Sequence, residues 1–159
     1  MHIKAHKAGQ VNEEDLNFVV ICVKLNSQWL LVRHKERTTW EMPGGHIEGE
    51  ESTQIAAFRE LYEETGIVKE EIENVCDYEV YDADRFSYGR LFYICVEEFG
   101  ELPGYEIEEV KLFNDFPENS TYPQIYETLI AQIRAYENTR NTSFARECED
   151  IRFYGDKTY

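Results

Sequence analysis

Three glutamates, Glu60, Glu63 and Glu64, lie close together near the end of one amphipathic stretch, residues 44–67. On a helix Glu60 and Glu64 would share one face, where two like charges repel each other at a cost of about 0.2–0.5 kcal/mol. The C-terminal end of a helix is itself partly negative, which further disfavours acidic side chains there. Arg59 can offset only part of this charge. We therefore expect a bound divalent cation to balance the rest.

The stretch that carries these glutamates predicts one helix with defined ends. Ser52 is a favourable N-cap, and Gly66 can adopt the left-handed conformation that ends a helix. Ala56 and Ala57 fall on the acidic side of this helix, which we expect to face a site. Three larger apolar side chains fall on the other side and are expected to pack inward: Ile55, Phe58 and Tyr62.

Other elements must position this helix, and the apolar pattern predicts several strands. Runs of apolar and β-branched residues lie at 18–25, 29–34, 40–43, 74–82, 88–99 and 109–113. A second helix is expected from Pro123, whereas the tail from about residue 137 shows no clear period. The order of strands, helix, strands and helix predicts an α/β fold in which helices pack on a mixed sheet.

The chain has the length and composition of one globular domain, which we expect to span residues 1–159. Its net charge of −16 disfavours nucleic acid and anionic membranes as partners. No stretch reaches 18 apolar residues, the first ten residues contain no apolar segment, and the four cysteines form no CxxC pair. We therefore expect a cytoplasmic protein with buried, reduced thiols rather than disulfides.

Residues 45–67 follow the pattern G-x5-E-x7-REL-x-EE-x-GI, which is the complete Nudix box, and the sequence WEMPGG (40–45) leads into it. The chain therefore resembles a Nudix hydrolase. With the flanking elements, the resemblance extends over roughly residues 18–135. It implies an α/β/α sandwich with a mixed β-sheet between helices, and hydrolysis of a nucleoside diphosphate linked to another moiety.

The resemblance also implies roles for individual residues of the box. Four positions correspond to the family's metal ligands: Glu60, Glu63, Glu64 and the backbone carbonyl of Gly44. The metal is expected to be Mg²⁺, with Mn²⁺ as a substitute, because Mg²⁺ prefers oxygen ligands and lowers the pKa of an attacking water. Arg59 is expected to orient the helix glutamates through a salt bridge. Glu51 is expected to brace the loop against the helix.

The resemblance leaves the general base open between two places in the chain. A carboxylate close to the attacking water can take its proton. Glu60 is favoured because its box position matches the base proposed for several members of the family. Many members instead use an acidic residue from a loop after the sheet. Here the candidates for that position are Glu98, Glu106 and Glu109, of which Glu106 is preferred.

Substrate contacts are expected on both sides of the box. Four residues form a compact basic cluster before it: Arg33, His34, Lys35 and Arg37. This cluster is interpreted either as a phosphate contact, with Arg33 preferred, or as a solvated hairpin end. Gly45 and His46 are further candidates, His46 at a position where the family frequently has Lys or Arg. Asn119 loosely resembles a purine-reading asparagine of the mutator-type enzymes.

The expected substrate is a small-molecule nucleotide. A nucleoside triphosphate, including an oxidised purine nucleotide such as 8-oxo-dGTP, would be cleaved to a monophosphate and pyrophosphate. ADP-ribose and dinucleoside polyphosphates are alternative substrates. A non-catalytic Nudix-fold module that senses nucleotides is an alternative of another class. The sequence is compatible with a monomer and with a homodimer.

Overall fold

The computed structural model describes the backbone of residues 1–104 and 106–155, and the side chains of residues 1–104 and 106–140. In this part of the chain seven strands form one sheet: β1 (His2–Lys7), β2 (Phe18–Leu25), β3 (Gln28–His34), β4 (Gly44–His46), β5 (Glu73–Asp82), β6 (Arg85–Val96) and β7 (Ile107–Phe113). The strand order is β1-β5-β6-β2-β3-β7, and β4 pairs with β2 off this path. Strands β2 and β6 are parallel and the other pairs are antiparallel, so the sheet is mixed.

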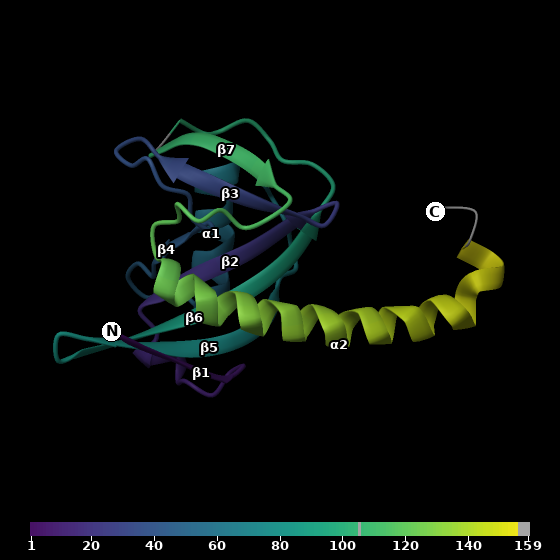
Figure 1. Ribbon diagram of the computed structural model, residues 1–159, viewed down its shortest axis with the longest axis horizontal. Helices are drawn as coiled ribbons and strands as arrows, with labels where there is room; N and C mark the ends of the chain where they lie inside the picture. The colour runs from purple at the N-terminus through teal and green to yellow at the C-terminus, as the bar shows by residue number, and fades with distance from the viewer. Residues whose placement is uncertain (105, 156–159) are drawn as a thin grey trace.

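Two helices, α1 (Thr53–Thr65) and α2 (Pro123–Gly155), cover opposite faces of the sheet, α1 behind it and α2 in front (Figure 1). The side chains of β2 alternate between the two faces, as a strand requires. Val19 and Ile21 pack with Leu61 of α1, whereas Cys22 packs with Leu129 of α2. The predicted α/β/α sandwich with a mixed sheet is confirmed.

Helix α1 has the predicted ends. The Ser52 hydroxyl oxygen accepts a hydrogen bond from the Ile55 amide at 3.2 Å, which satisfies one free N–H of the first turn. Gly66 has a φ of 75°, and its amide donates to the Tyr62 carbonyl at 2.8 Å. A residue with a Cβ would be strained in this left-handed conformation. The caps therefore fix where the glutamate-bearing turn stops.

The prediction of which side of α1 packs inward is wrong. Ile55 and Tyr62 are 55% and 46% exposed, whereas Ala56, Ala57 and Leu61 are fully buried against the sheet. The reason is distance, because small side chains allow a helix to approach a sheet closely and large rings would hold it away. The close approach brings the acidic turns of α1 against the glycine pair that follows β3 and the intervening loop.

Strand prediction near the glycine pair is also wrong by a few residues. Trp40 and Glu41 make only isolated bridges, to Ser120 and Val32, and the strand proper is β4 (Gly44–His46). Glycine weakens strand propensity, so the pairing of β4 with β2 had no local signal. The bridge between Val32 and Glu41 places the Glu41 side chain next to the end of β3.

Three further differences concern the ends of the chain and one thiol. The sequence predicted no strand at β1, which pairs along β5. Helix α2 continues through residue 155, over the tail for which no period was found. Cys22 and Cys76 are buried as expected, but Cys95 is exposed, and Cys148 lies outside the described side chains. Among the described residues, neither helix combines the length and hydrophobicity that a membrane span requires.

Strand β2 changes partner along its length. Residues 23–25 pair with β3, whereas residues 18–20 pair with β4, so the two partners part and leave an opening in the sheet. Next to this opening the β3–β7 register shifts between Arg33 and His34. The extra residue, Glu108, lies on β7, and such a bulge bends that strand and increases the local twist. The fold thus places the end of β3 and the start of β4 on either side of one gap.

Arg90 on β6 lies at the centre of a buried polar network that ties α1 to the sheet. Its Nε and Nη2 donate to the two carboxylate oxygens of Asp77 at 2.7 and 3.0 Å, and both side chains are at least nine-tenths buried. Its Nη1 donates to Glu13 at 2.7 Å, and Glu13 accepts a hydrogen bond from the Thr53 amide at the start of α1. The network therefore connects β5, β6 and the N-terminus of α1.

Replacing Asp77 by Asn should lower the free energy of unfolding by about 3 kcal/mol, because it leaves the Arg90 guanidinium buried without its anionic partner. Urea unfolding followed by circular dichroism measures this loss. As a control, Glu109→Gln removes the half-exposed partner of Arg33 and should change the same free energy by less than about 0.5 kcal/mol. Equal losses in the two variants would contradict the assignment.

Candidate active site

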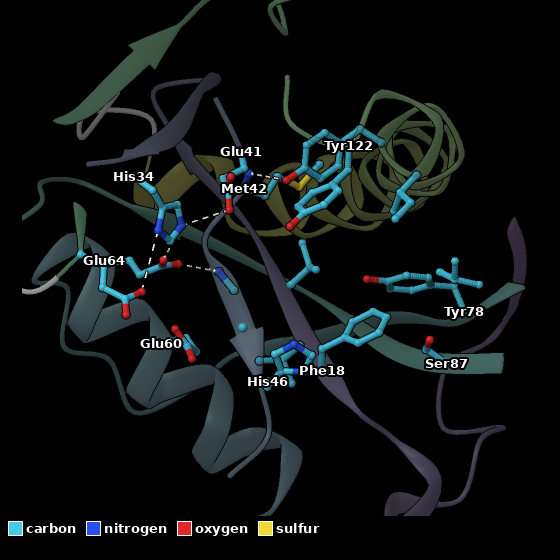
Figure 2. Close-up of a pocket in the computed structure, with 18 of the residues that line it drawn as sticks. Phe18, His34, Glu41, Met42, His46, Glu60, Glu64, Tyr78, Ser87 and Tyr122 are labelled. Carbon is cyan, nitrogen blue, oxygen red and sulfur yellow. Dashed lines mark hydrogen bonds and ion pairs between the residues drawn. The ribbon is translucent and has the colours of Figure 1, made fainter. Parts of the chain in front are cut away.

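A pocket of about 530 Å³ lies at the gap where β3 and β4 part. One end is acidic and is formed by the following labelled residues of Figure 2: His34, Glu41, Glu60 and Glu64. The other end is aromatic and hydroxyl-rich, with Phe18, Tyr78 and Ser87. The pocket thus has a charged end, bordered by α1, and an aromatic end that suits a flat, apolar group.

The acidic end is built by the last turns of α1 and the glycine pair. The Gly44 amide donates to Glu64 at 2.7 Å, which holds that carboxylate against the loop. A Cβ on Gly45 would lie 2.3 Å from a carboxylate oxygen of Glu60, so any larger residue here would displace that carboxylate. Burial, and then the charge of Glu64, raise the pKa of Glu60 to about 7. Burial also raises the pKa of Glu64.

Arg59 neutralises the outer side of this cluster. Its Nη2 and Nε donate to the two oxygens of Glu51 at 2.6 and 3.1 Å, and its Nη1 donates to Glu60 at 2.9 Å. Nη2 also donates to the carbonyl of His46 at 3.0 Å, so the guanidinium links α1 to the end of β4. Glu63 meets Arg59 at 3.3 Å and does not line the pocket. Of the three helix glutamates, Glu60 and Glu64 therefore line the pocket, whereas Glu63 contacts Arg59 outside it.

His34 neutralises the inner side, and its position was not predicted. Its Nε2 lies 3.0 Å from Glu41 and 3.2 Å from Glu64, and its Nδ1 lies 3.9 Å from Glu106. Hydrogen bonds to Glu41 and Glu64 raise the pKa of His34 to about 10, against the opposing effect of burial. The sequence placed His34 in the basic cluster but carried no signal for its partners. His34 lies where the β3–β7 pairing is irregular, with the extra residue Glu108 on β7, more than seventy residues away in the sequence.

The predicted substrate residues near the box are only partly gathered by the structure. Gly45 and His46 line the pocket. Of the basic cluster, His34 and Arg37 line it, while Arg33 does not. Arg33 instead lies 3.4 Å from a carboxylate of β7 on the surface. The preference for Arg33 within the cluster therefore has no support from its position.

Among the predicted residues that follow the box, too, some line the pocket and others do not. Asn119 donates weakly to the Thr38 carbonyl at 3.5 Å and lies outside the pocket. Of the later acidic candidates, Glu106 lines the pocket, whereas Glu98 and Glu109 do not. Glu106 is therefore the one later acid of the three that can act at this site.

The acidic end has the oxygen donors that a hard divalent cation prefers. In the described part of the chain no three His, Cys, Asp or Glu side chains are grouped so as to hold a metal ion by themselves. Mg²⁺ in proteins is usually held by one or two carboxylates together with substrate phosphates and water. Glu60 and Glu64, facing one pocket with Gly44 beside them, match that incomplete set. Burial raises the pKa of both carboxylates, and the charge of Glu64 raises that of Glu60 further; a bound cation would stabilise their ionised forms.

A scan against protein-family models matches the NUDIX domain over residues 15–119, which is well over half of the chain. The chain belongs to the NUDIX domain family. Nudix hydrolases generally use divalent metal ions, in agreement with the donor set described above. The match includes β2, β3, the glycine pair and all of α1.

Individual Nudix proteins are also similar to this chain in sequence. YtkD of Bacillus subtilis (strain 168), to which 8-oxo-dGTP diphosphatase activity is attributed, is 32% identical over 101 residues, covering 63% of each chain. An RNA pyrophosphohydrolase of Rhodopseudomonas palustris (strain HaA2) is 43% identical over 63 residues, covering 38% of each chain. The alignments thus span less than two thirds of these relatives' own lengths.

The Nudix fold is shared with the crystal structure of a mutant of the Bacillus subtilis pyrophosphohydrolase BsRppH. The two chains superpose with a TM-score of 0.74 at 21% identity, over 86% of this chain and 90% of the other. At this level of identity the superposition shows the fold and not the substrate.

Replacing Gly45 by Ala should weaken Mn²⁺ binding by about tenfold or more, because the added Cβ displaces the Glu60 carboxylate. Titration calorimetry with MnCl₂ and no nucleotide measures this change. The control is Glu50→Gln, which removes an exposed charge from the neighbouring loop without altering the pocket. Unchanged Mn²⁺ affinity in the Gly45 variant would show that Glu60 does not hold the metal.

Proposed function

We propose that this protein is a Mg²⁺-dependent hydrolase of nucleoside diphosphates linked to another moiety, and that its best substrates are nucleoside triphosphates, which it converts to monophosphate and pyrophosphate. The observation that carries the proposal is the two-part pocket. An acidic end that requires a cation adjoins an aromatic end that suits a nucleobase. A nucleotide has the same two parts, a polyphosphate and a flat ring.

Mg²⁺ held by Glu60, Glu64 and the Gly44 carbonyl would screen the phosphate charge and acidify an attacking water. Glu63, which contacts Arg59 outside the pocket, would become a further ligand by turning toward the metal. Mn²⁺ has similar ligand preferences and would substitute for Mg²⁺. Arg59 holds Glu60 and Glu63 in place and is itself held by Glu51. These are the positioning roles that we assign to Arg59 and Glu51.

Glu60 is our first choice for the residue that takes the proton from water. Its carboxylate lines the acidic end of the pocket, within reach of a water beside the metal, and its box position matches the base proposed for several members of the family. Glu106 is the alternative, since it lines the same pocket on a loop after β6. Its side chain is 86% exposed and lies 3.9 Å from His34, so it can reach the site only from the solvent side.

Arg37, rather than Arg33, is the cation that we assign to the substrate phosphates. Its Nη1 donates to Glu41 at 2.8 Å and to Tyr122 at 3.3 Å, which fixes the guanidinium at the rim of the pocket. Its Nε and Nη2 have no partner among the described residues and remain available. A guanidinium presents paired N–H groups that match phosphate oxygens. His34 is less suitable because two carboxylates already engage its Nε2.

The relatives narrow the choice of nucleotide without deciding it. The activity attributed to YtkD favours 8-oxo-dGTP, which agrees with the oxidised purine nucleotide expected from the sequence. The RNA pyrophosphohydrolases favour a 5′-triphosphate on RNA as a second candidate. The net charge of −16 opposes a long polyanion more strongly than a mononucleotide. We therefore place the free triphosphate first, with ADP-ribose and dinucleoside polyphosphates as further substrates to be tested.

Replacing Glu60 by Gln should lower kcat at least a hundredfold with the fold retained, because Gln can neither take a proton nor provide charge to a metal. Pyrophosphate release from a panel of triphosphates with Mg²⁺ measures this effect. Glu106→Gln is assayed in parallel, and the Mn²⁺ affinity of both variants is measured, since a loss in kcat with unchanged metal affinity identifies the base. Wild-type protein that binds nucleotides and never turns them over would favour the non-catalytic sensor instead.

Replacing Arg37 by Lys should raise KM for a triphosphate about tenfold, because Lys keeps the charge but loses the paired contact with phosphate. Initial rates over a range of substrate concentrations measure KM and kcat separately. Arg33→Lys is the matched control, and it should leave KM unchanged because Arg33 lies outside the pocket. A larger effect at Arg33 than at Arg37 would reverse the assignment.

A further inference from the structure

Tyr78 is a buried residue whose side chain lines the pocket. The residue is 1% exposed, and its hydroxyl points into the pocket from β5 (Figure 2). Among the described residues this hydroxyl has no hydrogen-bond partner. Among the described residues, Asn74 Oδ1 is the side-chain polar atom that is fully buried without a partner, so the Tyr78 oxygen, which also lacks one, reaches the open space of the pocket. The hydroxyl is therefore available to a ligand and to nothing else nearby.

The chemistry around Tyr78 favours a donor role for this hydroxyl. Burial raises the pKa of Tyr78 and of Tyr126, so both keep their protons at neutral pH. The Tyr126 oxygen already accepts a hydrogen bond from the Met42 amide at 3.0 Å, which leaves its proton uncommitted too. The aromatic end of the pocket thus offers two phenolic protons to a ligand.

Carboxylates are confined to the other end of the pocket. Three of them lie away from Tyr78 in Figure 2: Glu41, Glu60 and Glu64. The two remaining acidic side chains of the lining, Glu48 and Glu106, lie 3.7 and 3.9 Å from the two cations of the acidic end. A base that presents N–H donors to Tyr78 would find no carboxylate to accept them. A base that presents a carbonyl oxygen would find hydroxyl donors.

Aromatic rings line the pocket next to Tyr78, where a planar base could stack. Phe18 packs against Tyr78 with ring centroids 5.6 Å apart and meets the His46 ring edge-on at 6.3 Å. Tyr122 lines the same pocket from the start of α2. Aromatic walls of this kind stack on any nucleobase, so they give affinity without distinguishing guanine from adenine. Discrimination must come from a polar group such as the Tyr78 hydroxyl.

We propose that Tyr78 is a specificity-determining residue that donates a hydrogen bond to the 6-oxo group of a purine base, so that the protein prefers 6-oxopurine nucleotides over adenine nucleotides. Guanine, hypoxanthine and 8-oxoguanine share this acceptor, whereas adenine has an amino group there. The inference rests on the proposed nucleotide substrate and specifies its base.

The test is Tyr78→Phe, which removes the hydroxyl and keeps the ring that packs on Phe18. With Mg²⁺, kcat/KM for GTP and ITP should fall about tenfold, the usual effect of losing one neutral hydrogen bond. For ATP and 2-aminopurine riboside triphosphate, which lack the 6-oxo group, kcat/KM should stay within about twofold of wild type. The melting temperature should not fall, because the hydroxyl has no partner among the described residues.

A matched control on the same strand is Tyr81→Phe, whose hydroxyl donates to Asp84 at the surface and does not line the pocket. It should leave the ratio of GTP to ATP turnover unchanged. Calorimetric titration of GMP and AMP, without metal, measures base preference independently of catalysis. Wild type should bind GMP more tightly than AMP, and Tyr78→Phe should abolish the difference.

Three results would overturn the proposal. One is a wild-type protein that does not distinguish GMP from AMP, and another is a Tyr78 variant that keeps full preference. The third is an equal loss for all four triphosphates, which would show a structural role. Absence of turnover for every nucleotide, with the GMP preference intact and dependent on Tyr78, would refute the hydrolase proposal and leave this inference standing.

Discussion

The concentration of carboxylates between α1 and the sheet is the constraint on which the rest of the structure depends. Glu60 and Glu64 are buried on one helix face, and this burial raises the pKa of both carboxylates. Arg59 offsets this charge from the loop side and His34 from the sheet side. Arg59 and His34 together do not balance all the carboxylates, so the centre of the pocket keeps an excess of negative charge. This charge distribution supports our proposal that a cation and a polyphosphate bind together, although the protein as a whole is strongly acidic.

The scaffold serves this arrangement in two ways. Alanines on α1 let the helix approach the glycine pair closely, and the change of partners along β2 opens the sheet where the carboxylates point. The buried pair of Arg90 and Asp77, with Glu13, fixes the opposite end of the same helix. The helix is thus held at both ends while its last turns face the pocket. This is the rigid support that a preorganised site requires.

The sequence allowed the box, the caps of α1 and most strands to be predicted, because these depend on local spacing. Ser52 and Gly66 act on their own helix, and the run of β-branched and apolar residues that predicts β2 lies within eight residues. The orientation of α1 was wrong because the depth of a helix against a sheet depends on both partners. Glycine spacing alone did not indicate β4.

Several features of the site had no local signal at all. His34 lies at the irregular end of the β3–β7 pairing, and Glu41 comes close to it through a bridge in the middle of β3. Arg33 and Arg37 look alike in sequence, and only the path of the loop between them decides which one lines the pocket. Tyr78 has the pattern of an ordinary strand residue. That its hydroxyl faces the pocket without a partner among the described residues depends on the packing of several elements.

The parallel pairing of β2 with β6 has a consequence for how the protein is made. Phe18 lies beside Gly89 in this pair, so the centre of the sheet closes a loop that contains the entire box. Contacts so distant in sequence form slowly, because the entropy of loop closure opposes them. Because synthesis proceeds from the N-terminus, the acidic helix emerges from the ribosome before β6 does. Until then its exposed charge keeps the nascent segment solvated and separate from other chains.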